Sequence, residues 1–421
     1  MGITNHSRAL AVLTLCAFTF GTGEIMIAGL LPEMAESVGV SLSTAGLLVS
    51  AFAATVMVGG PLLVLATGRS RRRRVLVALM LLFVAGNAVA ALAPSFALLA
   101  MGRIAAALAH AALMPLFFAV AADVAPPERQ GSAVARVSLG FSLALVGGLP
   151  LGTALGHWLG WRATFWGMAG LAAVALVLVA PVVPDTPAAG PGGRTAELRV
   201  LADRRVQAVI AVTVLGAAGA FTAYTFVTPL LTGVAGFGAT TVTVLLLLFG
   251  AGGTVGGLAG GRLADRSVTG AILAGMAALA VSLLGLGLLA GERAGAVVFL
   301  LSFGAAYYAV IPVVNTRMIE VASRGARTLA LTVQSSAFNM GIAFGGWLGG
   351  RVIDPGPGLR WTPVAGAVVA ALGCAVALVE HHRSAAVPPA AVLPAAELPA
   401  AELPAAELPA AELPETQETL G

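Results

Sequence analysis

The chain has 421 residues, of which 58% are hydrophobic and only 10% are charged, and its mean hydropathy is +0.96. Soluble domains carry roughly a quarter charged residues, so this composition excludes a water-soluble fold and indicates a membrane protein. The formal net charge is +4, and all 23 basic residues are arginine. These arginines fall in short loops between apolar runs, a placement that argues against nucleic-acid binding.

Apolar runs long enough to cross a bilayer recur about twelve times along the chain. They lie at about 8–31, 43–67, 75–93, 97–123, 131–157, 163–182, 207–232, 240–261, 269–290, 295–319, 327–350 and 362–380. The first run is a retained helix rather than a signal peptide, because so many further spans follow it. The sequence therefore predicts an all-α membrane protein with about twelve transmembrane helices.

The arginines also predict how the spans are oriented. Loops on one side of the spans hold nearly all of them, and only Arg162, Arg293, Arg351 and Arg360 fall on the other side. Positively charged loops stay in the cytoplasm. We therefore expect a multi-pass protein of a bacterial cell membrane with both termini cytoplasmic.

The chain repeats itself with a shift near 195 residues, so that Arg69 after the second span corresponds to Arg262 after the eighth. This repeat predicts an N-terminal six-helix bundle (1–182), a cytoplasmic linker (183–206) and a C-terminal six-helix bundle (207–383). Two pseudo-symmetric halves are a transporter architecture, with the binding site between them near the middle of the membrane.

The remaining segment, 384–421, is a low-complexity tail in which Pro-Ala-Ala-Glu-Leu occurs four times. A proline every five residues blocks a continuous helix, and an acidic repeat of this kind cannot form a core. We expect this tail to be disordered.

Three motifs in the spans form a recognisable set. The first span contains Thr22-Gly23-Glu24 followed by Gly29-Leu30-Leu31-Pro32, and the eleventh runs from Phe338-Asn339-Met340-Gly341 to Leu348-Gly349-Gly350. The fifth span contains Gly147-Gly148-Leu149-Pro150-Leu151-Gly152, then Gly156 and the turn Gly160-Trp161-Arg162. Over about residues 8–380 the chain resembles the major facilitator superfamily, in particular its twelve-helix drug:proton antiporters. These include bacterial chloramphenicol-resistance and arabinose-efflux-like permeases. The resemblance implies that Gly148, Pro150, Gly152 and Gly156 form the helix-packing signature of the antiporters.

The resemblance also implies a pair of gating loops. The superfamily's loop after the second helix usually reads Gly-x-Leu-Ala-Asp-Arg, and the second copy here, which ends in Asp265-Arg266, keeps it. The first copy, which contains Arg69 and Arg71, has no Asp. The arginines at 69–74 are a topology signal, and they are also candidates to contact anionic lipid or to hold the cytoplasmic gate.

Glu24 is the one carboxylate well inside an apolar run, and an ionisable residue inside a span is by default a functional hypothesis. It lies about seven residues, or roughly 10 Å, from the outer end of its span. Arg103 lies at a similar depth in the fourth span, so the two residues are placed to approach each other. Leu99-x-x-x-Arg103 resembles the fourth-helix motif of the family, whose arginine is implicated in proton coupling. The alternative is a static ion pair that only orients the helices.

A carboxyl group in apolar surroundings favours its protonated form, whereas a nearby guanidinium favours the ionised form. A site that alternates between these surroundings can load a proton on one side of the membrane and release it on the other. We therefore predict Glu24 and Arg103 as the proton-coupling residues.

Other polar side chains within the spans are candidates to line the substrate cavity. They are His110, Tyr224, Asn339, Asn87 and Gln334. The alternative for each is a packing role, because polar side chains in membranes commonly form hydrogen bonds between helices.

Glycines at four-residue intervals predict close approaches between helices, and we expect them to form a seam between the two halves. They include Gly252, Gly256 and Gly260 of the eighth span and Gly148, Gly152 and Gly156 of the fifth.

Together these features predict proton-coupled efflux, by antiport, of a small lipophilic compound, such as the antibiotic chloramphenicol. Export of a sugar or nucleoside is the alternative on the same fold, and a transporter-like membrane sensor or a membrane-embedded enzyme are alternatives from other classes. The spans contain no paired carboxylates, no His-Glu-x-x-His and no nucleophile arrangement, so we expect no enzyme.

We expect the partners to be a small-molecule substrate, protons and the lipid bilayer, with the chain a monomer. No cofactor is predicted, since the proton gradient supplies the energy. Cys16 and Cys374 lie in apolar stretches near opposite ends of the chain and form no Cys-x-x-Cys motif, so neither a disulfide nor a metal site is predicted.

Overall fold

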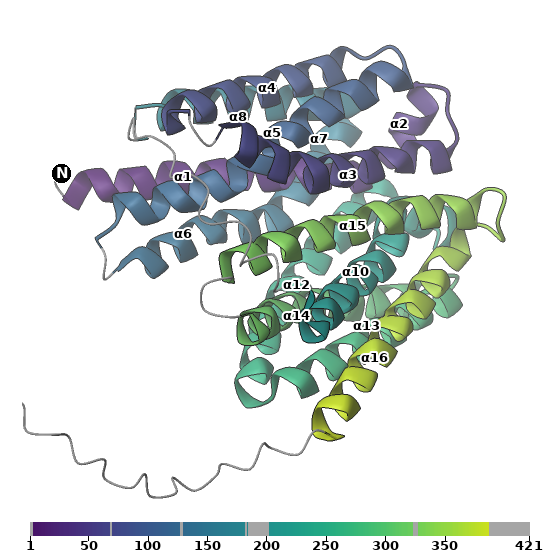
Figure 1. The fold of residues 1–421 in the computed structure, drawn as a ribbon. Helices are drawn as coiled ribbons and strands as arrows, with labels where there is room; N and C mark the ends of the chain where they lie inside the picture. Colours follow the sequence, from purple (N-terminus) through teal and green to yellow (C-terminus); the bar gives the residue numbers. More distant parts are fainter. Residues whose placement is uncertain are drawn as a thin grey trace, which may run out of the picture. The chain divides into compact units, whose positions relative to one another are not determined.

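The computed structural model describes residues 3–67, 70–126, 129–181, 183, 202–322 and 327–386, and Figure 1 shows how they are arranged. These residues form helices joined by turns and short loops. The prediction of an all-α protein is confirmed. Met1–His381 form one compact unit.

The described residues of the first half form eight α-helices and two short turns of other helical types. They are α1 (Ile3–Ile25), the 3-10 turn η1 (Met26–Gly29), α2 (Leu31–Ser37), α3 (Leu42–Thr67), α4 (Arg72–Leu92), α5 (Phe96–Val124), α6 (Gln130–Leu143), the π turn η3 (Ala144–Gly148), α7 (Leu149–Leu159) and α8 (Trp161–Val179).

The second half has a similar content. Its elements are α10 (Arg204–Tyr224), α11 (Val227–Pro229), the π turn η5 (Leu230–Val234), α12 (Ala239–Arg266), α13 (Val268–Leu289), α14 (Arg293–Val321), α15 (Arg327–Ile353), the 3-10 turn η7 (Leu359–Trp361) and α16 (Thr362–Ala386).

Among the described residues, eleven helical segments are long and apolar enough to cross a membrane. The remaining predicted span, at 327–350, corresponds to α15, which is 27 residues long and carries several polar side chains, including Gln334 and Asn339. The internal repeat is visible in two 29-residue helices, α5 and α14, which contain Pro115 and Pro312 at matching positions. Proline is tolerated inside membrane helices because neighbouring groups satisfy the backbone that it leaves unpaired. The predicted division into 1–182, 183–206 and 207–383 stays a prediction, and the tail 384–421 lies almost entirely outside the described residues.

Glycines bring helices together within each half. In the first half, Gly86 of α4 lies against the backbone of Gly102 in α5. In the second half, Gly256 of α12 lies against the backbone of Ala305 in α14, and Gly260 against that of Ala309. The prediction that the glycines of this span form a seam between the halves is therefore wrong for Gly256 and Gly260. Their face of α12 is turned toward α14 of the same half.

The glycines of the fifth-span motif also pack within one half. Gly148 of η3 lies against Thr22 of α1, and Gly156 of α7 lies against Leu30. Gly152 approaches Met26, and its carbonyl oxygen accepts a 2.9 Å hydrogen bond from the hydroxyl of Thr164 in α8. These contacts hold the η3–α7 segment against the segment that carries Glu24. Gly148, Gly152 and Gly156 therefore do not face the other half, although η3 and α7 do contact α12 of the second half.

The two halves meet through α3 and α15, which lie side by side (Figure 1). Ser43 of α3 approaches Gly350, and Gly46 lies against the ring of Phe226. Further along α3, Val58 and Leu62 are exposed. The contacts between α3 and α15 thus involve the end of α3 that the arginine pattern predicts to face outward.

Smaller contacts join the halves elsewhere. Gly250 of α12 lies against the backbone of Leu145 in η3, α12 also contacts α7, and α11 contacts both α2 and η1. Gly250 is the glycine of α12 that meets the first half, and it precedes Gly256 and Gly260 along the helix.

Candidate functional site

Glu24 is the second-last residue of α1, just before the chain tightens into η1. The packing of Gly29 against Thr153 and of Gly148 against Thr22 fixes this part of the chain against α7 and η3. The carboxyl-bearing side chain is 17% exposed. Glu24 is therefore positioned by packing on both sides of it, at the point where α1 ends.

The carboxylate of Glu24 points to His110 of α5. Its Oε2 atom lies 3.5 Å from Nε2 of His110, whose side chain is 8% exposed. The imidazole lies beside two phenyl rings, with centroids 6.3 Å from Phe20 and 5.5 Å from Phe52. A proton-binding pair of an acid and a base is thus enclosed in apolar surroundings.

Arg103 lies two turns earlier in α5 and is the largest fully buried side chain of the described residues. Its Nη1 donates a 2.8 Å hydrogen bond to the carbonyl oxygen of Gly23, and its guanidinium lies 4.3 Å from the centre of the Phe52 ring. Within the described part of the chain, Nε and Nη2 have no hydrogen-bond partner. Arg103 therefore contacts α1 one residue before Glu24 and retains free donors.

All three tyrosines of the chain lie in the second half. They are Tyr224 of α10 and Tyr307 and Tyr308 of α14. We call these residues the tyrosine cluster. Their rings are close to one another and to neighbouring phenyl rings. The centroid distances are 5.0 Å for Tyr307–Tyr308, 5.4 Å for Tyr224–Phe249, 5.2 Å for Tyr224–Phe221 and 6.3 Å for Tyr307–Phe338.

The tyrosine cluster belongs to a hydrophobic core that crosses between the halves. Ile25 and Leu149 of the first half pack into the same core as Tyr224 and Tyr307. The residue that follows Glu24 therefore packs in the same core as these tyrosines of the second half. The predicted site residues Glu24, Arg103, His110 and Tyr224 come together at this junction.

Sequence reasoning missed Tyr307 and Tyr308. The internal repeat carried a signal, because Pro115 and Pro312 stand 197 residues apart and the same offset leads from His110 to Tyr307. A search for the repeat partner of His110 would have found Tyr307.

The side-chain amides of Asn87, Gln334 and Asn339 donate hydrogen bonds within a helix or between neighbouring helices. Nδ2 of Asn87 donates to the carbonyl oxygen of Phe83 at 2.8 Å, and Nε2 of Gln334 donates to the hydroxyl of Thr213 at 2.6 Å. Nδ2 of Asn339 donates to the carbonyl oxygen of Ser335 at 3.0 Å. Two of these bonds remain within one helix, and the third joins α15 to α10.

The predicted gating residues lie at helix ends. Arg69 lies outside the described residues, and Arg71 is the N-cap residue of α4. Asp265 and Arg266 are exposed at the C-terminal end of α12.

An ion pair that the sequence did not predict lies at the same end of the first half. Nη1 of Arg72 donates to Oδ2 of Asp123, which joins the start of α4 to the end of α5. The loop motif of the first copy lacks its acidic residue, and Asp123 supplies a carboxylate to the neighbouring arginine.

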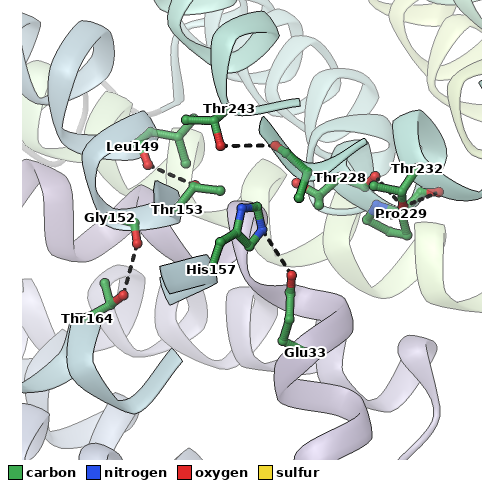
Figure 2. A network of polar contacts seen from close by, with 11 residues as sticks. Glu33, Leu149, Gly152, Thr153, His157, Thr164, Thr228, Pro229, Thr232 and Thr243 are labelled. Carbon is green, nitrogen blue, oxygen red and sulfur yellow. Dashed lines mark hydrogen bonds and ion pairs between the residues drawn. The ribbon is translucent and has the colours of Figure 1, made fainter. Parts of the chain in front are cut away.

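A second acid–histidine pair lies near the other end of the first half, and Figure 2 shows it. Nε2 of His157 in α7 lies 3.0 Å from Oε1 of Glu33 in α2. The hydroxyl of Thr153, one turn earlier in α7, donates to the carbonyl oxygen of Leu149 at 2.9 Å. This pair joins α2 to α7. Among the described residues, no group of three or more His, Cys, Asp or Glu side chains could hold a metal ion.

Comparison with known proteins identifies the family. The family model described as Major Facilitator Superfamily matches residues 13–327. The chain belongs to the Major Facilitator Superfamily. It is therefore a multi-pass membrane protein of a transporter family, and the predicted fold is confirmed.

Relatives of known name support this membership. The chain is 40% identical over 366 residues to the "Inner membrane transport protein YdhP" of Escherichia coli (strain K12), covering 86% of this chain and 93% of the relative. It is 34% identical over 340 residues to the "Chloramphenicol resistance protein" of Streptomyces lividans, covering 80% and 86%.

Solved structures of other superfamily members share the fold at low sequence identity. One is a bacterial homologue of the human lysosomal transporter Spinster in an inward-facing, occupied conformation. It aligns with a TM-score of 0.76 and 17% identity over 91% of this chain and 98% of that chain. The other is a D-xylose-proton symporter, with a TM-score of 0.70 and 18% identity over 87% and 96%.

Proposed function

We propose that this member of the superfamily exports a small lipophilic compound in exchange for protons, and that Glu24 carries the proton. The observation that carries the proposal is the position of the Glu24 carboxylate. It lies 3.5 Å from His110 in apolar surroundings, where the two halves of the chain meet. A membrane protein keeps an ionisable group there at a free-energy cost, which points to a function.

The coupling follows from the two basic groups beside Glu24. The carboxylate lies 3.5 Å from Nε2 of His110, while Arg103 is hydrogen-bonded to the adjacent backbone carbonyl. A shift of α1 relative to α5 changes the distance from Glu24 to both groups and so changes how strongly it holds a proton. Moving one charge across the membrane yields about 2.3 kcal/mol per 100 mV.

The direction of transport rests on the predicted orientation, with both termini cytoplasmic. In that orientation, the contacts of Ser43 and Gly46 with the second half close the outer side. Alternation between this arrangement and one closed on the inner side would expose Glu24 to each side in turn. We propose that Arg71, Asp265, Arg266 and the Arg72–Asp123 pair take part in closing the inner side.

The substrate class rests on the aromatic surface beside Glu24. Tyr224, Tyr307 and their phenyl neighbours offer an apolar face with few polar atoms, which suits a lipophilic ligand. A relative 34% identical bears the name "Chloramphenicol resistance protein". We therefore propose chloramphenicol as the first substrate to test.

The test is a resistance assay in a bacterial host that lacks its own drug pumps. Expression of the protein is expected to raise chloramphenicol resistance, and an uncoupler is expected to restore drug accumulation in the cells. Glu24→Gln is expected to abolish export. Glu36→Gln is the matched control, because Glu36 is an exposed residue of α2. Full proton-driven export by the Glu24→Gln protein would overturn the proposal.

A further inference from the structure

The hydroxyl groups of Tyr224 and Tyr307 are buried without a partner. The two side chains are 4% and 5% exposed, and within the described part of the chain neither hydroxyl forms a hydrogen bond. A buried polar group without a partner destabilises a protein, so most such groups are satisfied by protein, water or ligand. Each tyrosine hydroxyl can donate a hydrogen bond, so a ligand with an acceptor atom could satisfy it.

The rings that carry these hydroxyls are stacked against phenyl rings, so the surface around them is aromatic and apolar. The Tyr224 ring is stacked on Phe249 with an angle of 29° between the planes, and the Tyr307 ring is stacked on Phe338 with an angle of 24°. Phe221 lies beside both tyrosines, with centroids at 5.2 Å and 6.0 Å. A planar aromatic molecule is the ligand that such ring faces favour.

The core that holds these tyrosines extends into the half of the chain that carries Glu24. Ile25 and Leu149 belong to it, and Ile25 is the residue next to Glu24. When the halves separate at this junction, the apolar face and the two hydroxyls are uncovered together with the Glu24 carboxylate. A ligand that enters there meets donors on one side and an acidic group on the other.

We propose that Tyr224 and Tyr307 select the substrate, and that its class is a planar aromatic compound with hydrogen-bond-accepting oxygens at one edge and a donor at another. The oxygens accept from the two tyrosine hydroxyls of the second half. The N–H or O–H donor binds the ionised carboxylate of Glu24 in the first half. This inference rests on the proposed export function and deepens it.

The arrangement also accounts for the exchange of such a ligand with a proton. A donor on the ligand requires the ionised form of Glu24, because a protonated carboxyl has lost much of its capacity to accept. The proton and the ligand therefore compete for the carboxylate of Glu24. The tyrosine hydroxyls bind the ligand but not the transported proton.

The test compares two probes on the purified full-length protein in detergent. Chloramphenicol is aromatic and carries nitro and amide oxygens as well as O–H and N–H donors. Ethidium is a planar aromatic cation with amine donors and no acceptor oxygen. Equilibrium dissociation constants for both are measured for the wild type and for Tyr224→Phe and Tyr307→Phe, which keep the ring and remove the hydroxyl.

Tyr308→Phe is the matched control. Its ring belongs to the same cluster and lies against Gly253, but the side chain is half-buried and its hydroxyl is not among the buried hydroxyls without a partner. We expect Tyr224→Phe and Tyr307→Phe each to weaken chloramphenicol binding about fivefold, which corresponds to about 1 kcal/mol. Ethidium binding by these variants, and binding of both probes by Tyr308→Phe, are expected to be unchanged.

Several outcomes would contradict the inference. Unchanged chloramphenicol affinity in both variants would show that the hydroxyls do not bind the ligand. An equal loss of affinity for chloramphenicol and ethidium would show that the two hydroxyls serve packing. A loss of proton-driven exchange with unchanged chloramphenicol affinity would show that they relay protons. A wild type that binds ethidium but not chloramphenicol would overturn the ligand class while leaving export intact. A wild-type protein that exports neither chloramphenicol nor ethidium from cells would overturn the proposed function, and this inference with it.

Discussion

Nη1 of Arg103 donates a 2.8 Å hydrogen bond to the carbonyl oxygen of Gly23, the residue immediately before Glu24. The guanidinium is thus fixed to the backbone of α1 beside the acidic side chain, while the carboxylate itself is paired with His110. Two basic side chains thus lie near Glu24. Arg103 binds the backbone beside it, and His110 lies beside its carboxylate.

Arg103→Met tests whether the guanidinium serves coupling or stability. A buried guanidinium with two nitrogens that have no hydrogen-bond partner among the described residues carries a desolvation cost that an apolar side chain does not. We expect the thermal unfolding midpoint of the variant to be equal to or above that of the wild type. Proton-driven export is expected to be lost. A variant that unfolds but still transports when rescued at low temperature would assign Arg103 to stability.

His110→Phe removes the imidazole that lies 3.5 Å from the Glu24 carboxylate and retains a ring beside Phe20 and Phe52. Because the apolar contacts remain, we expect little change in the unfolding temperature. Proton-driven export is expected to fall about tenfold, which corresponds to about 1.4 kcal/mol. Substrate exchange between equal concentrations, which needs no net proton movement, should continue at the wild-type rate. A parallel loss of both activities would argue against a role in coupling.

Gly256→Ala and Gly261→Ala are expected to have opposite effects. A methyl group at Gly256 would collide with the backbone of Ala305, and overpacking of this kind costs about 1–3 kcal/mol. A methyl group at Gly261 meets nothing within 4 Å, so the gain in helix propensity, about 1 kcal/mol, remains. Thermal unfolding in detergent measures both changes. Equal effects of the two substitutions would contradict the close packing of α12 and α14.

A disulfide between Ser43→Cys and Gly350→Cys is expected to lock the halves together at the predicted outer end. A Cβ atom at position 350 would lie 3.6 Å from Cβ of Ser43, within the range of disulfides. Oxidation should form the cross-link and stop export, and reduction should restore it. Each single cysteine variant is the control for the native Cys16 and Cys374. Unimpaired export by fully cross-linked protein would show that the halves need not separate here.

The sequence by itself determined the class of the protein and the content of its spans. Low charge and repeated apolar runs follow from the demand of the hydrocarbon core for apolar side chains, so they can be read residue by residue. The same demand makes Glu24 and Arg103 conspicuous, because a charged group inside a span is costly and is seldom kept without a function. The family resemblance rested on motifs such as Thr22-Gly23-Glu24, which are local as well.

Only the tertiary structure decided which of these residues meet and which faces the helices turn to one another. The glycines of α12 predicted a seam between the halves, yet Gly256 and Gly260 face α14, because rotation of a helix about its axis is set by packing. The pairing of Glu24 with His110, and the shared core of Ile25 with Tyr224 and Tyr307, depend on contacts between segments far apart in the chain. Spacing along one helix contains no information on such contacts.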